Sequence, residues 1–88
     1  MYLNNCIVQG EIVSIDKVKF CYYERLKAIL VIHISISSNM NNIMECRIYD
    51  GNIDIFLDKY VLNDICILCG SLKNKDKEFD YILVNEIY

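Results

Sequence analysis

The feature that most constrains this 88-residue sequence is a strict two-residue alternation between Leu26 and Ser37. Every second residue from Leu26 to Ile36 is apolar, and the positions between them are mixed, with Lys27 and His33 among them. A side-chain period of two is typical of a β-strand that packs one face on a core. The alternation therefore predicts a sheet protein whose second face is partly covered.

Other parts of the chain carry further strand patterns, rich in β-branched and aromatic residues. We predict strands over residues 6–20, 43–49, 65–72 and 79–88, with connections at 21–25, 38–42 and 73–78. Gly10 lies inside the first strand and predicts a bulge or sharp bend, by which small barrels turn corners. The strand over 65–72 is apolar on both faces, so we expect it to be central or well covered.

Between residues 53 and 61 the apolar period changes from two to that of an α-helix. The residues with helical spacing are Ile53, Phe56, Leu57, Tyr60 and Val61. Asn52 is the expected N-cap, and Asn63-Asp64 is the expected stop and turn. The pattern predicts one short helix that plugs the end of a barrel.

The predicted order is three strands, one helix and two strands, in a single domain over residues 1–88. This all-β pattern with one short helix is that of the OB-fold, a five-stranded, partly open Greek-key barrel. SH3-like barrels lack such a helix, and a ferredoxin-like fold needs two helices.

Composition and motifs exclude several classes of protein. No apolar run reaches the ~18 residues of a membrane span, and the N-terminus lacks signal-peptide character, so we expect a cytoplasmic protein that does not enter membranes. Common motifs of nucleophilic, phosphate-binding or metal-dependent enzymes are missing, and His33 is the only histidine. We therefore expect no enzyme activity, no cofactor, no metal and no small-molecule substrate, and an ordinary place for His33 on a sheet face.

The five cysteines are predicted to be small apolar residues rather than disulfide partners or ligands. Cys66 and Cys69 form a C-x-x-C pair within a predicted strand. Side chains three apart on a strand point to opposite faces, so these two thiols cannot share a zinc ion.

Five segments carry a resemblance to a known family. They are Asn5 to Ile12 (NCIVQGEI), Lys27 to Ile36 (KAILVIHISI), Glu45 to Gly51 (ECRIYDG), Asp58 to Asp64 (DKYVLND) and Ile65 to Leu72 (ICILCGSL). In order and spacing they resemble the bacterial single-stranded DNA-binding protein (SSB) family, including its shorter PriB-like relatives. The resemblance implies an OB-fold, binding of single-stranded DNA, and a homodimer or homotetramer.

The sequence also departs from that family. It has no tryptophan, whereas the family commonly stacks bases on one. We also expect no acidic C-terminal tail like that of the family. We expect a barrel-only variant.

Single-strand binding without sequence preference combines aromatic rings, which stack on bases, with cations along the phosphates. The resemblance places a base-stacking aromatic at Tyr49; packing of that ring against the helix is the alternative. The further candidates for nucleic-acid contact are Arg47, Lys27, Lys73, Lys75, Tyr22 and Tyr81. For the lysines of the 73–77 segment, the alternative is a solvated loop tip.

The net charge of −3 opposes nucleic-acid binding unless the charges are segregated. Most basic residues fall in the first strand, the first connection and the 73–77 segment, whereas Asp54 and Asp58 lie on the helix. We therefore predict non-sequence-specific binding of single-stranded DNA in replication, recombination or mobile-element DNA metabolism. RNA is an alternative ligand, and an OB-fold protein–protein adaptor with little DNA affinity is the alternative function.

Overall fold

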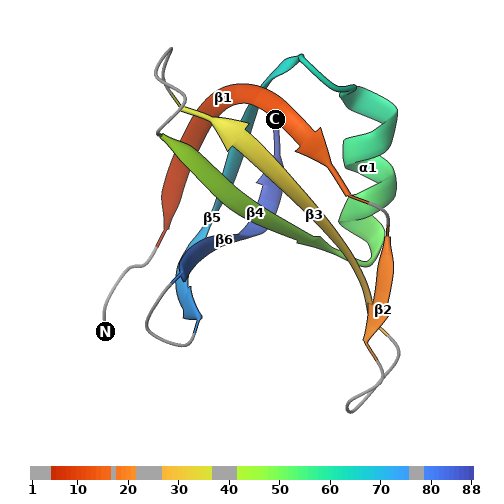
Figure 1. Ribbon diagram of the computed structural model, residues 1–88. Coiled ribbons are helices and arrows are strands. Elements are labelled where there is room, and N and C mark those ends of the chain that lie inside the picture. Colours follow the sequence, from red (N-terminus) through yellow and green to blue (C-terminus); the bar gives the residue numbers. More distant parts are fainter. Residues whose placement is uncertain (1–4, 17, 22–26, 37–41, 76–78) are drawn as a thin grey trace.

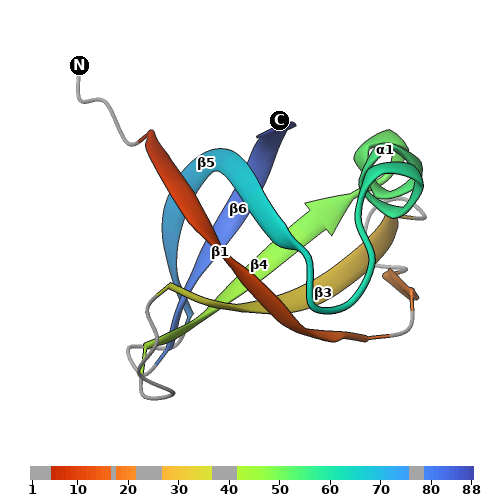
Figure 2. The same ribbon diagram turned by 90° about the horizontal axis from the view of Figure 1, so that it is seen from above.

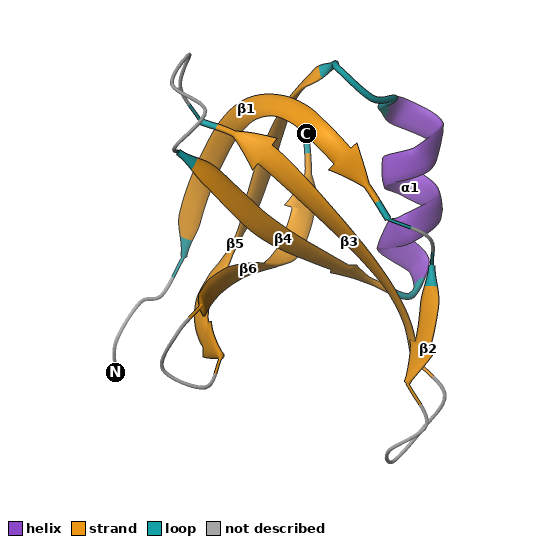
Figure 3. Ribbon diagram, in the orientation of Figure 1, coloured by secondary structure: helices purple, strands orange, loops and turns teal. Residues whose placement is uncertain are grey.

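Strands make up most of the part of the chain that the structure describes, and one helix lies among them (Figures 1 and 3). The computed structural model describes residues 5–16, 18–21, 27–36, 42–75 and 79–88. The elements are β1 (Cys6–Ile15), β2 (Lys19–Cys21), β3 (Lys27–Ser35), β4 (Ile43–Tyr49), α1 (Gly51–Lys59), β5 (Ile65–Lys75) and β6 (Phe79–Ile87). Within these ranges, no helix has the length and apolar character that crossing a membrane requires.

The strands close into a barrel. They pair in the order β1-β5-β6-β4-β3-β2, and an additional β1–β3 pairing joins the ends. All pairings are antiparallel except β4–β6, which is parallel. Because β1 and β2 both pair with β3, they act as one barrel strand. The predicted five-stranded OB-fold, with its helix between the third and fourth barrel strands, is confirmed.

The predicted first strand over residues 6–20 is wrong in its continuity. β1 ends at Ile15 and β2 begins at Lys19, with Asp16 donating its backbone N–H to the Val31 carbonyl at 2.9 Å. The pairing of β1 with β3 also slips between Ile12 and Ser14. The predicted single strand is therefore irregular in its pairing and is divided into two strands.

Gly10 lies beside the point where β1 changes its partner strand, and the one register irregularity in β1 falls further on, between Ile12 and Ser14. Residues before it pair with β5 and residues after it pair with β3, the change of partner falling at Glu11. A Cβ atom at Gly10 would collide with the carbonyl oxygen of Ser35. The missing side chain therefore lets β1 cross β3 closely enough to close the barrel.

The core lies inside the barrel and follows the predicted alternation. On β3 and β4 the buried residues are Leu30, Ile32, Ile34, Cys46 and Ile48. The prediction that the 65–72 strand is central or well covered is confirmed in its first form, because β5 pairs with β1 on one side and β6 on the other, while its outer face is not covered. Cys66 and Leu68 are buried, but Ile65 is 63% exposed and Ile67 is also exposed.

Helix α1 covers one end of the barrel, as the view from above shows (Figure 2). On α1, Ile53 and Phe56 are buried in the core and Leu57 is exposed. Val61 is also exposed and lies beyond the helix, which ends at Lys59, so the apolar face is narrower than predicted. The predicted Asn52 N-cap is wrong because the helix already begins at Gly51.

Asp50 makes the turn from β4 into the helix. Its φ of 51° lies in a region that non-glycine residues rarely adopt. Two hydrogen bonds hold this backbone: the Asp50 N–H donates to the Ala28 carbonyl at 3.0 Å, and the Ala28 N–H donates to Asp50 Oδ1 at 3.1 Å. The carboxylate therefore ties the turn to β3 instead of capping the helix.

Candidate nucleic-acid interface

A row of polar side chains crosses the outer face of the barrel. Each residue of the row is paired with the next one on the neighbouring strand. The row runs from Lys73 on β5 through Tyr81 on β6, Glu45 on β4 and His33 on β3 to Ser14 on β1. We call these five residues, together with Arg47, the polar row. Every barrel strand contributes to it, so its geometry depends on the closed barrel.

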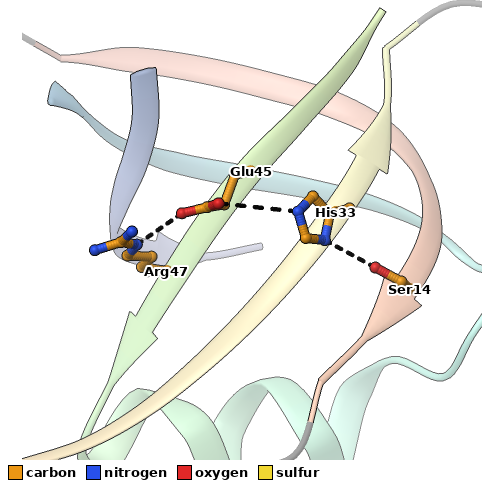
Figure 4. Close-up of polar contacts among 4 residues, drawn as sticks. All are labelled: Ser14, His33, Glu45 and Arg47. Atoms are coloured by element: carbon orange, nitrogen blue, oxygen red, sulfur yellow. Dashed lines mark hydrogen bonds and ion pairs between the residues drawn. The ribbon is translucent and has the colours of Figure 1, made fainter. Parts of the chain in front are cut away.

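Side-chain contacts link the middle of the polar row (Figure 4). Ser14 Oγ lies 2.9 Å from His33 Nδ1, and His33 Nε2 lies 3.9 Å from Glu45 Oε1. Arg47 Nε donates to Glu45 Oε2 at 2.7 Å. The Arg47 guanidinium carbon also lies 3.9 Å from the centroid of the Tyr81 ring, which makes a cation–π contact.

Arg47 is held as a cation by its neighbours. Partial burial works to lower the pKa of its guanidinium, but the hydrogen bond and charge of Glu45, aided by Tyr49, raise that pKa above its ordinary value. Its side chain is only 18% exposed. Glu45 thus neutralises the one cation that touches an aromatic ring among the outer-face residues the structure describes.

Four of the predicted contact residues lie on the same side of the barrel. Arg47 lies over Tyr81, and Lys73 pairs with Tyr81 across the β5–β6 ladder and is exposed. Tyr49 follows Arg47 by two residues on β4, so both side chains lie on the outer face. The structure therefore gathers Arg47, Lys73, Tyr49 and Tyr81 on one side of the barrel.

Tyr49 borders an open pocket of about 410 Å³. The other lining residues are Asp50, Leu83, Val84 and Asn85. The ring is half-buried at the point where β4 turns into α1. Stacking on a base and packing against the helix therefore both remain predictions for this ring.

Two further predicted residues, Lys27 and Lys75, lie at the ends of their strands. Lys27 opens β3 opposite Cys21, and Lys75 ends β5 opposite Phe79; the structure describes their backbone positions alone. The β2–β3 ribbon and the β5–β6 hairpin extend from different sides of the barrel (Figure 1). Tyr22 lies outside the described residues, as do Lys17 and Lys77.

Comparison with solved structures finds a protein whose fold is similar to that of this chain. The chain is similar to the SSB domain of a protein from Synechococcus sp., with a TM-score of 0.77 at 15% sequence identity, over 100% of this chain and 97% of that one. The barrel is an SSB-like OB-fold. No family model and no curated protein matches the sequence. The likeness supports the sequence resemblance at the level of fold, and the PriB-like variant stays a prediction.

In this SSB-like OB-fold, His33 has more polar neighbours than the sequence around it indicated. A serine hydroxyl and a carboxylate flank its ring, although nothing near His33 in the sequence suggested either. Alternation placed His33 and Glu45 on outer faces, but the β1–β3 and β3–β4 registers were needed to bring them together. The 3.9 Å from His33 to Glu45 exceeds a hydrogen bond, so this is not an assembled catalytic triad.

Glu45 also corrects the predicted segregation of charge. The expectation that carboxylates lie away from the binding face is wrong here, because Glu45 stands in the middle of the polar row. Helix α1 likewise carries Lys59 beside its two aspartates. The field on the candidate interface therefore depends on how Glu45 is paired.

Cys46 and Cys66 are buried in the core of the barrel. Desolvation by burial raises the pKa of Cys46 to about 12 and that of Cys66 to about 11. Cys66 is buried and Cys69 is half-buried on the opposite face of β5, as the strand period predicted. Among the residues that the structure describes, no three histidine, cysteine, aspartate or glutamate side chains are grouped to hold a metal ion.

Proposed function

We propose that this protein binds single-stranded DNA without sequence specificity, through the outer face of β3, β4 and β6. One observation carries the proposal: the Arg47 guanidinium rests on the Tyr81 ring, with the exposed Lys73 on the adjoining strand. Aromatic faces for bases and cations for phosphates are what such binding requires. The corresponding strand face is where OB-folds bind oligonucleotides.

The structural neighbour supports the same assignment, because the solved Synechococcus chain is named an SSB domain. Roles in replication, recombination or mobile-element DNA metabolism, in the cytoplasm and as a homodimer or homotetramer, are part of this proposal. RNA is the alternative ligand. Competition between oligothymidylate and oligouridylate of equal length measures that preference.

The test is a fluorescence-anisotropy titration with an oligothymidylate longer than the ~16 nucleotides that one OB-fold covers. We expect binding at low salt that weakens as salt rises. Each phosphate contact should contribute about −0.7 to the slope of the logarithm of the binding constant against the logarithm of the salt concentration. Tyr81→Ala should weaken binding about tenfold, as loss of one stacking contact does. Tyr88→Ala is the matched control, since Tyr88 ends the same chain segment away from the polar row. No binding at low salt would rule the proposal out.

A protein–protein adaptor is the second candidate function, favoured by a separate observation. The outer face of the β1–β5 pair carries exposed Ile7, Ile65 and Ile67, and the protein's net charge is −3. Exposed apolar residues on a paired sheet suit contact with another protein surface. Light scattering with size-exclusion chromatography gives the oligomeric state, and Ile65→Lys should reduce it if this face joins subunits.

A further inference from the structure

The Glu45 carboxylate stands between two groups that can carry positive charge. Its Oε2 accepts from Arg47 Nε at 2.7 Å, and its Oε1 lies 3.9 Å from His33 Nε2 (Figure 4). Arg47 is charged at all working pH values, whereas imidazole is the side chain that ordinarily gains its charge between pH 8 and 5. The three side chains therefore carry a net charge of zero or plus one, depending on His33.

The surroundings of His33 suit both protonation states. Ser14 Oγ lies 2.9 Å from Nδ1, and a hydroxyl can donate to a neutral ring nitrogen or accept from a protonated one. The charged or titratable groups that face the ring from its neighbouring strands are Glu45 and Arg47 on β4 and the exposed Glu11 on β1, opposite Ser35. Glu45 Oε1 lies 3.9 Å from His33 Nε2, so Glu45 is the first partner of an imidazolium.

Resting on the function proposed above, we propose that Glu45 is a counter-ion shared by Arg47 and His33, and that protonation of His33 releases Arg47 to bind a nucleic-acid phosphate. A charged imidazolium and the carboxylate form a charge-assisted hydrogen bond after a small side-chain rotation that shortens the 3.9 Å gap. The guanidinium, still against Tyr81, then lacks its compensating charge. Single-stranded DNA binds more tightly at acidic pH as a result.

A simpler mechanism makes a different prediction. If protonated His33 merely contacted a phosphate itself, the pH effect would survive the loss of Glu45 or Arg47. With a shared counter-ion, Glu45→Gln frees Arg47 at every pH, so binding at pH 8 becomes tight and the pH effect shrinks. Arg47→Gln removes the released cation, so binding stays weak and nearly pH-independent.

The experiment measures oligothymidylate binding by anisotropy at pH 8 and pH 5.5 for the wild type and four variants. Thymine has no group that titrates in this range. We expect the wild type to bind about tenfold tighter at pH 5.5, equivalent to one charge-assisted contact. His33→Gln should remove that ratio, and Glu45→Gln and Arg47→Gln should behave as stated above. Asp58→Asn, which removes an equal charge from the exposed face of α1, should keep the wild-type ratio.

A second measurement needs no nucleic acid. The NMR signal of the Arg47 Nε–H in the free protein should shift with the same midpoint as the His33 ring signals. If it shifts while DNA fails to bind, the shared counter-ion stands and the proposed function falls. If DNA binds while the Arg47 signal stays constant through the His33 titration, the shared counter-ion is overturned and the proposed function survives.

Discussion

At the scale of single residues, Gly70 shows, as Gly10 does, how closely the strands of this barrel approach one another. A Cβ atom at Gly70 would collide with the backbone carbonyl of Leu83 and lie 2.8 Å from the Ile82 side chain. Gly70 also follows the register shift between β5 and β6. Its small size therefore allows the two strands to pair again after the shift.

We predict that Gly70→Ala destabilises the protein, because the clash involves backbone that cannot move without breaking the ladder. The expected loss is about 1–3 kcal/mol in the free energy of unfolding, measured by urea denaturation. Gly51→Ala is the control, because a Cβ atom there meets nothing within 4 Å and Ala favours the helix. Equal stabilities of the two variants would refute this account of Gly70.

The buried thiols predict how stability depends on pH. The pKa values of Cys46, about 12, and Cys66, about 11, lie above the ordinary 9.0 because burial penalises the thiolate. Folding thus favours the protonated thiols, and their contribution is complete below about pH 9 and falls as pH rises through 11 and 12. We expect urea midpoints to decline over pH 9–11, and less so in Cys46→Ala compared with its own value at pH 7. An identical decline in that variant would contradict the assignment.

At the scale of elements, α1 acts as a plug through a narrow set of contacts. Phe56 is 0% exposed and lies 5.6 Å, centroid to centroid, from the Tyr60 ring. The Tyr60 hydroxyl in turn donates to the backbone carbonyl of Tyr88. The helix therefore connects the core to the end of the chain.

Phe56→Ala should cost about 3–5 kcal/mol of stability, since it removes a fully buried ring and leaves a cavity. Leu57→Ala, one position along the helix and 43% exposed, should change stability far less. Thermal or urea unfolding of the two variants measures the contrast. Similar losses would mean that the helix does not seal the barrel through Phe56.

Element identities were predictable because alternation and helical spacing are local properties of the sequence. Five barrel strands, the helix and the central place of β5 follow from such patterns. The separation of β1 from β2 was missed because it depends on pairing with β3, and the helix start at Gly51 was missed because the Asp50–Ala28 hydrogen bonds fix the turn before it. Apolar content alone also does not show that the outer face of β5 is exposed.

The candidate interface was predictable only in part, for a related reason. Arg47, Tyr49, Lys73 and Tyr81 share an outer face that strand periodicity assigns. The contact of Arg47 with Tyr81 and the Ser14–His33–Glu45 chain depend on the register between different strands. A one-residue slip would reverse the faces, so periodicity cannot supply those pairs.

At the scale of the whole molecule, an acidic protein must attract DNA through a local field. The net charge of −3 gives long-range repulsion, which salt screens over about 10 Å at 0.1 M. Contacts with phosphates on the polar row oppose this repulsion at short range. The affinity for single-stranded DNA therefore reflects both effects, and the loss of a single lysine should change it measurably.

Lys73→Ala should weaken oligothymidylate binding and reduce the magnitude of the log–log salt slope by about 0.7, the value for one phosphate contact on a single strand. Lys59→Ala is the matched control, because it removes the same charge from α1, where the cation lies 5.7 Å from the Tyr60 ring centroid. Anisotropy titrations at several salt concentrations give both slopes. Equal changes in the two variants would point to a general charge effect.

The change of partner along β1 has a consequence for how the protein folds. The joint between β1 and β5 brings together Cys6 and Gly70, which are 64 residues apart in the chain, whereas β3 meets β4 across a short connection. Ordering a loop that long costs chain entropy before any contact repays it. We therefore expect the β3–β4 hairpin to form early and the pairing of β1 with β5 to form last. Folding as a whole should take milliseconds to seconds, as is typical of barrels.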